Sequence, residues 1–193
     1  MDGTHTLRRV LGTVPVEPDG SASFEGPPLR GLYFVALDEK GLAVKRMQSY
    51  TMVMPGETQG CVGCHEPRTE LPGSATRGAL MALERPPSRI KPVPGVPEVI
   101  HYPRDVQPSW DRHCVTCLSA EKPLGRVVLT GDNNEWFTQR FYTLFAYDQV
   151  SDAWPWGEYG NNPPYGFGTG ASPLMQKIDG SHYDVELTRR EHD

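Results

Sequence analysis

The stretch Cys61-Val62-Gly63-Cys64-His65 is the most informative part of this sequence for predicting its fold. Two thiols three positions apart can each form a thioether with one vinyl group of a single haem, and the imidazole that follows can ligate the iron. This pattern is typical of covalent c-type haem attachment. We therefore expect Cys61 and Cys64 to hold a haem c, with His65 as an axial ligand of its iron.

A second cysteine pair, Cys114-Val115-Thr116-Cys117, has the same spacing but is followed by Leu118. A hydrocarbon side chain cannot ligate iron. The sequence thus contains one complete attachment motif and one that lacks the adjacent iron ligand.

Four cysteines also allow two other interpretations. Closing the C-x-x-C rings as disulfides is mainly seen in redox-active dithiols, and gives His65 no role. A structural zinc site could use all four thiolates, but 49 residues separate Cys64 from Cys114, where zinc ribbons commonly use about 15 to 20. Covalent haem accounts for more of the motif than either alternative.

The composition limits the class of protein. The 20 Gly and 19 Pro among 193 residues indicate a loop-rich architecture. The net charge is −5 and no lysine or arginine cluster exceeds a local pair, so nucleic-acid binding has no electrostatic support. No apolar run approaches the roughly 18 residues of a membrane span.

Both ends of the sequence predict a piece of a longer protein. The N-terminus, Met1-Asp2-Gly3-Thr4-His5, lacks the basic and apolar regions of a signal peptide, although covalent haem attachment normally takes place outside the cytoplasm. Thr188 and Glu191 have the spacing of a capping box that begins a helix. We therefore expect a fragment of an exported protein, located in the periplasm or otherwise outside the cytoplasm.

The first third of the chain has the pattern of β structure. Short alternating segments at 10–16, 21–25, 32–37, 42–47 and 50–54 are separated by turn residues at 17–20 and 38–41. The sequence predicts a mixed fold, with a small β-sandwich-like domain over residues 1–58 and a loop-rich, partly helical region over 59–193.

Two helices are expected in the second region. One covers 106–114, where Val106, Trp110 and Cys114 share a face, and the other covers 172–178, with Ser172 as N-cap and Pro173 at the first helical position. Seven prolines between Pro86 and Pro108 predict an extended segment. That segment is either a linker or a chain that wraps a flat apolar cofactor.

A set of motifs resembles the hydrazine synthase α subunit middle domain family, and together these motifs span nearly the whole chain. They are Leu11-Gly12-Thr13-Val14-Pro15-Val16, Asp19-Gly20-Ser21-Ala22, Tyr33-Phe34-Val35-Ala36-Leu37-Asp38, the run from Pro55 to Arg68, Tyr102-Pro103-Arg104-Asp105-Val106-Gln107-Pro108, Asp111-Arg112-His113-Cys114-Val115-Thr116-Cys117, Ala171-Ser172-Pro173-Leu174 and Gly180-Ser181-His182-Tyr183-Asp184-Val185.

The resemblance implies two covalent haems on a β-rich, cytochrome-c-like module of a larger exported protein. It implies that Cys114 and Cys117 hold the second haem, and that His182 supplies a distal ligand to its iron. A redox partner protein and the other domains of the parent protein are the expected partners.

Two positions depart from the family pattern. Thr69 stands where the hydrazine synthases place a tyrosine that binds the first haem iron, so we do not expect hydrazine synthesis. Leu118 replaces the histidine of the second motif, which leaves the second haem absent, five-coordinate through His182, or ligated by another residue. His113 and His101 are further ligand candidates, although His113 lies on an apolar helix face, where a packed histidine is the ordinary role.

Three functions follow from these patterns. The first is electron transfer through one or two haems c. The second is a structural zinc domain. The third is a haem redox enzyme domain that binds a small molecule at an open iron position.

Overall fold

The computed structural model describes residues 8–47, 49–62, 69, 80–133, 135, 138–151, 162–180 and 182–192. The chain forms two compact units. We call the unit made of 9–34 and 47–94 the loop unit, and the unit made of 1–8, 35–46 and 95–193 the helical unit. Each is described by itself.

The loop unit is held together by a few short strand pairs. Strand β1 (Phe24–Glu25) pairs in parallel with β4 (Ser88–Arg89), and single bridges join Thr13 to Lys91 and Leu32 to Thr51. The start of the proline-rich segment therefore pairs with the N-terminal segment of the same unit.

Gly12 is required where the N-terminal segment meets Lys91. Its φ is +131°, and a Cβ at this position would lie 2.1 Å from the Lys91 carbonyl oxygen. Only glycine permits both this backbone conformation and this approach. The neighbouring residue Thr13 then exchanges two backbone hydrogen bonds with Lys91, of 2.8 and 3.0 Å.

Polar contacts fix the 3₁₀ helix η1 (Met81–Leu83) of the loop unit. The Asp19 carboxylate accepts from the Ser21 hydroxyl at 2.6 Å and from the Met81 backbone N–H at 2.9 Å. These hydrogen bonds, that of Ser21 first, lower the pKa of Asp19. Arg85 forms an ion pair with Glu17 at 2.5 Å. Asp19 thus joins the turn at 17–20 to the start of η1.

The helical unit begins with a β-hairpin. Strands β2 (Val35–Leu37) and β3 (Ala43–Arg46) are antiparallel, with Val35 opposite Arg46. The Asp38 carboxylate accepts from the backbone N–H groups of Lys40 and Leu42 at 2.9 and 2.8 Å, which closes the turn. The hairpin predicted around 38–41 is confirmed.

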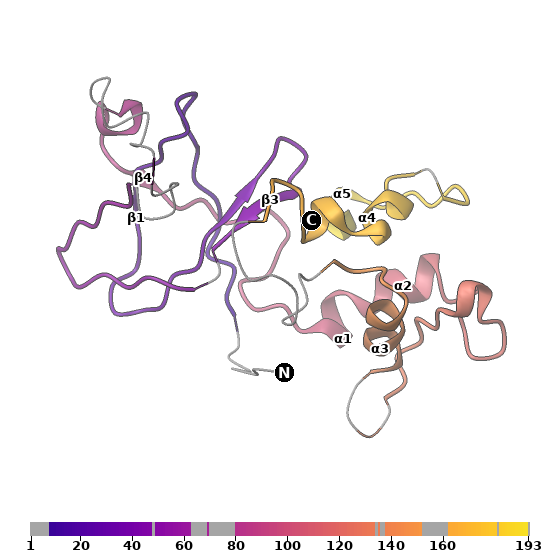
Figure 1. Cartoon of the computed structure of the whole chain (residues 1–193). Coiled ribbons are helices and arrows are strands. Elements are labelled where there is room, and N and C mark those ends of the chain that lie inside the picture. The colour runs from indigo at the N-terminus through magenta and orange to yellow at the C-terminus, as the bar shows by residue number, and fades with distance from the viewer. Residues whose placement is uncertain are drawn as a thin grey trace. The chain divides into compact units, whose positions relative to one another are not determined.

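Residues 162–171 run beside this hairpin (Figure 1). The Tyr165 N–H donates to the Val44 carbonyl at 3.0 Å, and the Ala43 N–H donates to the Thr169 hydroxyl at 2.7 Å. The Arg46 guanidinium lies 4.8 Å from the centroid of the buried Phe167 ring. Thr169 opens the 3₁₀ helix η3 (Thr169–Ala171).

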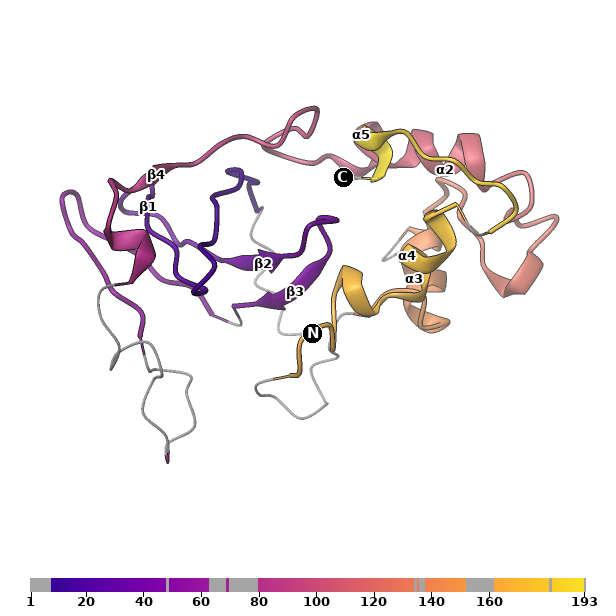
Figure 2. The same cartoon turned by 90° about the horizontal axis from the view of Figure 1, so that it is seen from above.

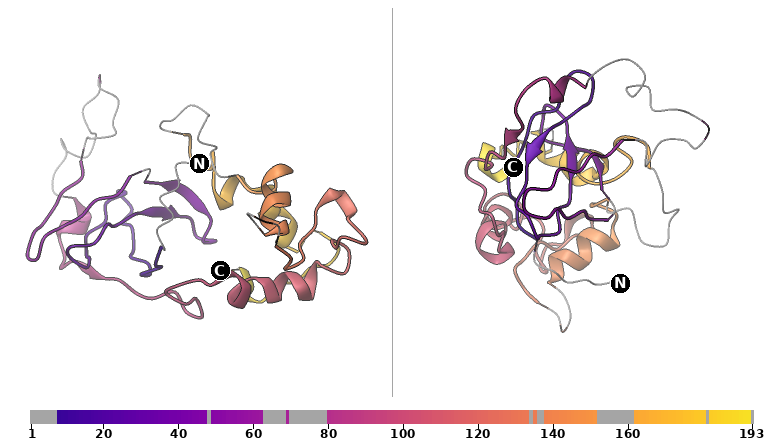
Figure 3. Two further views of the ribbon diagram at one scale, coloured as in Figure 1. Left: turned by 90° about the horizontal axis from the view of Figure 1, so that it is seen from below. Right: turned by 90° about the vertical axis from the view of Figure 1, so that its left-hand side faces the viewer.

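Short helices make up the rest of the helical unit. They are α1 (Tyr102–Asp105), α2 (Gln107–His113), η2 (Leu124–Arg126), α3 (Gln139–Ala146), α4 (Pro173–Ile178) and α5 (Arg189–His192). Figure 2 shows α5 alongside α2, and Figure 3 shows the neighbouring helices α3 and α4 in the left-hand view.

The core of the helical unit is a small apolar cluster of Val127, Leu129 and Leu144. Leu129 is its most deeply buried member, at 2% exposure. The half-buried apolar residues that pack against this cluster are Trp110, Cys114, Val115, Leu118, Val150 and Leu174.

The mixed fold class is confirmed, with short paired strands in both units and the described α-helices in the helical unit. The strands are shorter than predicted, since the segments at 10–16 and 50–54 contribute single bridges. The division at residue 58, the β-sandwich likeness and the cytochrome-c likeness stay predictions. In the described part of the chain, no helix combines the length and apolar character needed to cross a membrane.

Candidate functional site

The loop before the first cysteine motif is anchored to the loop unit. The Met54 N–H donates to the Glu57 carboxylate at 2.6 Å and the Glu57 N–H donates to the Met54 carbonyl at 3.1 Å, which closes a turn. The Thr51 hydroxyl donates to the side-chain oxygen of Gln59 at 2.7 Å. Two residues later, Cys61 is exposed. Its thiol is therefore accessible on a loop that is tied at its base.

Cys64 and His65, the remaining reactive residues of this motif, lie outside the described residues. The predictions that Cys64 forms a thioether and that His65 ligates iron therefore stay predictions. Thr69, which is described, is exposed.

The second cysteine pair follows the end of α2. The Cys114 N–H continues the helix by donating to the Trp110 carbonyl at 2.8 Å. Cys117 and Leu118 both donate from their backbone N–H groups to the Cys114 carbonyl, at 3.1 and 3.0 Å. This tight turn follows directly from the predicted helix over 106–114, which the structure confirms as α2.

The two thiols of this pair lie in different surroundings. Cys114 is half-buried and packs against the core cluster, whereas Cys117 is exposed. Burial, with a smaller effect of the neighbouring Cys117, raises the pKa of the Cys114 thiol. The structure thus turns one thiol of the pair toward apolar packing and leaves the other in solvent.

Leu118 occupies the position where a haem motif places its histidine, and it is part of the core packing. Its carbonyl accepts from the Leu129 N–H at 2.8 Å, and it forms a bridge with Pro123. Leu118 therefore has a structural role that connects the cysteine turn to the most buried residue of the unit.

The candidate distal ligand, His182, is exposed. Its ring packs edge-to-face on Tyr183, with centroids 4.5 Å apart. Among the described residues, no group of three or more His, Cys, Asp or Glu side chains is placed to hold a metal ion. The structure therefore does not gather His182 with other described residues into a metal site.

The other two candidate histidines have local partners. His113 Nε2 lies 3.3 Å from Glu191 Oε1, and the side chain is 19% exposed. His101 precedes α1, and its backbone N–H donates to the Asp105 carboxylate at 2.7 Å. Glu191 also forms an ion pair with Arg112, so α5 is joined to α2 directly before the cysteine turn.

The capping box predicted at Thr188 is confirmed. The Thr188 N–H and hydroxyl both donate to the Glu191 carboxylate at 2.9 Å, and the Glu191 N–H donates back to the Thr188 hydroxyl at 3.3 Å. The Thr188 contacts, more than Arg112, lower the pKa of Glu191 to about 2. The Glu191 carboxylate also joins α5 to α2, through Arg112 and His113.

Helix α3 and the pocket beside it were not predicted. Thr138 caps α3 by accepting from the Phe141 N–H at 3.3 Å, and Arg140, Thr143 and Leu144 form its buried face at i, i+3 and i+4. This cap and spacing are visible in the sequence. Arg140 conceals the pattern, because an arginine at a buried position does not count as apolar.

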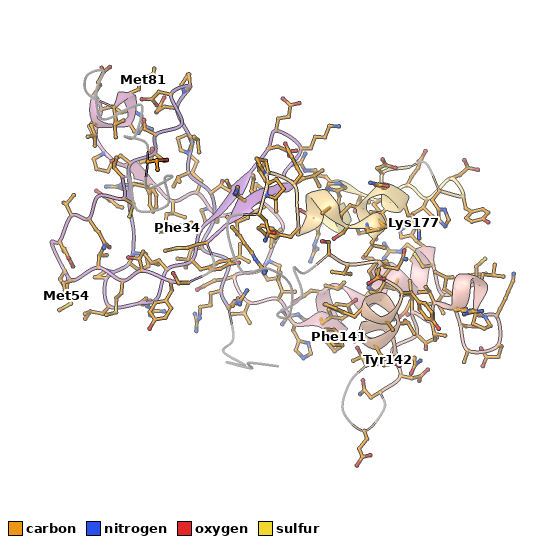
Figure 4. The ribbon with its side chains drawn as sticks, in the orientation of Figure 1. Phe34, Met54, Met81, Phe141, Tyr142 and Lys177 are labelled. Atoms are coloured by element: carbon orange, nitrogen blue, oxygen red, sulfur yellow. The ribbon has the colours of Figure 1, made fainter. Side chains whose placement is uncertain are left out.

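The pocket has a volume of about 450 Å³. The residues that line it come from the four helices α1 to α4, from the residue between α1 and α2, and from the segments on either side of α3. They are Tyr102, Val106, Trp110, Thr138, Arg140, Phe141, Leu144, Phe145, Val150 and Leu174. Figure 4 shows Phe141 and Tyr142 extending from α3.

Comparison with known families supports the resemblance read from the sequence. The family model described as hydrazine synthase alpha subunit middle domain matches residues 2–66, about a third of the chain. The matched segment contains the whole C-x-x-C-H motif and ends one residue after His65. No curated protein and no solved structure matches the chain.

Proposed function

We propose that this chain is an electron-transfer module of a larger exported protein, located outside the cytoplasm, and that it holds one haem c. Cys61 and Cys64 form the thioethers and His65 ligates the iron. The observation that supports this proposal is the complete C-x-x-C-H motif inside the segment that matches the family. In this proposal the chain combines a β-sandwich-like domain with a cytochrome-c-like haem region.

The described cysteine of this motif fits covalent attachment. Cys61 is exposed, so its thiol is accessible to a haem vinyl group, and the turn at Met54 and Glu57 holds the loop base. A haem held there would supply a one-electron iron couple. The protein residues provide the two sulfur attachments and one imidazole.

The second cysteine pair fits a haem poorly. Leu118 has no atom that can ligate iron, and its packing against the core is incompatible with a ligand at that position. Cys114 and Cys117 also differ in exposure, whereas two thioethers to one haem need both sulfur atoms at its edge. The proposed function therefore uses the first motif alone, and His182 as a distal ligand stays a prediction.

Hydrazine synthesis is not part of the proposal. Thr69 is exposed and carries a short aliphatic hydroxyl, which cannot replace a tyrosine phenolate as an iron ligand. An electron-transfer role requires only the attachment and axial ligation that the motif supplies.

Haem content tests the proposal. The chain is made with an export signal in cells that carry the c-type haem maturation machinery. The denatured protein is then analysed by alkaline pyridine haemochrome spectroscopy and by intact mass. We expect one covalent haem per chain. The proposal is wrong if no haem absorbance remains with the denatured chain. Stoichiometric zinc that is lost in Cys114→Ser would instead support the zinc domain.

A further inference from the structure

The pocket beside α3 has the size and lining of a small-molecule site. Its volume of about 450 Å³ lies within the roughly 300–1,000 Å³ of ligand pockets. Aromatic and aliphatic side chains make up most of its wall, including Trp110 from α2 and Leu174 from α4. An apolar body of one or two rings would therefore fit its interior.

Arg140 adds a buried positive charge to this wall. The residue is 3% exposed and its guanidinium carbon lies 4.3 Å from the centroid of the Tyr102 ring. Its Nε is buried without a hydrogen-bond partner, and no carboxylate among the described residues forms an ion pair with it. A buried charge is costly unless an opposite charge compensates it.

The other polar groups of the pocket wall are already engaged. The Trp110 indole N–H donates to the Tyr102 hydroxyl at 2.5 Å, and the Thr138 hydroxyl caps α3. Among the described residues that line the pocket, Arg140 is the cationic side chain. The wall therefore combines an apolar interior with one guanidinium that lies against Tyr102 and has no carboxylate partner among the described residues.

We propose that this pocket binds a small molecule that has an apolar ring or chain and one carboxylate, and that the carboxylate pairs with Arg140. The site is separate from the proposed haem function, because none of its lining residues belongs to either cysteine motif. Its test therefore does not depend on haem attachment. The full chain is made without haem maturation, so that no porphyrin carboxylate competes.

Two probes of the same shape test the charge requirement. The affinities of 2-naphthoate and of its uncharged amide, 2-naphthamide, are measured by isothermal titration calorimetry. We expect one saturable site, with naphthoate bound about tenfold or more tightly than the amide, because a charge-assisted hydrogen bond contributes at least that much. Absence of saturable naphthoate binding, or equal binding of the two probes, overturns the proposal.

Substitutions then test whether Arg140 is the residue that pairs with the carboxylate of the probe. Arg140→Met is expected to weaken naphthoate binding about tenfold or more, while amide binding stays within about twofold. Arg126→Met removes an exposed arginine of the same unit and is expected to change neither affinity. Unchanged naphthoate binding by Arg140→Met overturns the proposal. Retained amide binding shows that the variant has kept its pocket.

A second variant covers the case in which Arg140→Met does not fold. Leu174→Trp adds volume to the pocket wall from the half-buried start of α4 and keeps the buried charge. We expect it to lose binding of both probes. Naphthoate binding at the wild-type affinity would place the ligand elsewhere and overturn the proposal.

Discussion

Cys61 and Cys114 each begin a C-x-x-C pair, yet they lie in different physical surroundings. Cys61 is exposed on a loop that is anchored at its base, whereas Cys114 ends a helix and is half-buried against the core cluster. Position 118, which corresponds to the histidine of the first motif, holds a leucine that packs against the same core. In this chain the exposed thiol of Cys61 begins the motif that ends in a histidine, whereas the pair followed by a leucine packs partly in the core.

From this difference we infer that spacing alone does not define a haem site. Three-residue spacing brings two thiols to one turn, but attachment also needs both sulfur atoms accessible and a ligand beside them. In the second pair, the position that follows the second cysteine holds Leu118, which packs against the core. The predictions below test this contrast, beginning with the largest expected effect.

The largest expected effect is the complete loss of covalent haem from the first motif. Cys61→Ala/Cys64→Ala removes both sulfur attachments, so the haem count should fall from one to none. The matched Cys114→Ala/Cys117→Ala chain should keep one haem, because the second pair lacks an adjacent ligand. Intact mass after haem maturation measures both counts. Loss of haem from the second variant would contradict the comparison.

The second prediction concerns the core that holds the second pair. Leu129 is 2% exposed and receives the Leu118 contacts, so Leu129→Ala should lower the free energy of unfolding by about 2–5 kcal/mol. Leu124, which is 49% exposed, is the control, and Leu124→Ala should change stability by no more than about 0.5 kcal/mol. Urea unfolding measures both. Equal small losses would show that the cluster does not stabilise the unit.

Local patterns in the sequence predicted the local structure well. The turn residues around Asp38 gave a hairpin, and the Thr188–Glu191 spacing gave a capping box with both reciprocal hydrogen bonds. Ser172 does precede α4, but its hydroxyl donates to the Gly168 carbonyl and accepts from the Ser151 N–H, and does not cap the helix. The Ser172 hydroxyl therefore pairs with Gly168 and Ser151 and not with the first turn of α4.

Long-range features were not predictable from these patterns. The parallel pairing of β1 with β4 joins residues far apart in sequence, and no local periodicity specifies it. Leu118 was read as a missing ligand, whereas its packing role became visible only with Leu129 and Leu144 in place. The pocket depends on a buried arginine, which hydrophobic patterns treat as a surface residue.

The third prediction compares the thiols directly in haem-free single-cysteine chains. Burial raises the pKa of Cys114 and covers part of its sulfur, so it should react several-fold to about tenfold more slowly than Cys61 with a disulfide reagent. Reaction with Ellman's reagent at pH 8 gives the rates. Leu129→Ala in the Cys114-only chain should remove most of the difference. Equal rates for the Cys61-only and Cys114-only chains would contradict the burial of the Cys114 thiol.

The smallest expected effect lies at α5, where Glu191 contacts Arg112 and His113 directly before the second cysteine pair. The pKa of Glu191 is lowered from 4.5 to about 2, first by the Thr188 backbone hydrogen bond. A group whose folded pKa is lowered stabilises the fold above its unfolded pKa, and this stability is lost as the pH falls from about 5 toward 2. Glu191→Gln should remove the same stabilisation at pH 7, which lowers the stability of α5 by about 1 kcal/mol.

Amide exchange at the end of the chain measures this effect. The backbone N–H groups of Glu191 and His192 both donate to the Thr188 carbonyl at 3.0 Å. Their protection factors should fall about fivefold in Glu191→Gln, which corresponds to about 1 kcal/mol. Glu186→Gln removes the same charge from an exposed position outside the capping box and should leave both amides unchanged. An equal loss of protection in the two variants would mean that net charge, rather than the contacts of Glu191 with Thr188 and α2, holds α5 in place.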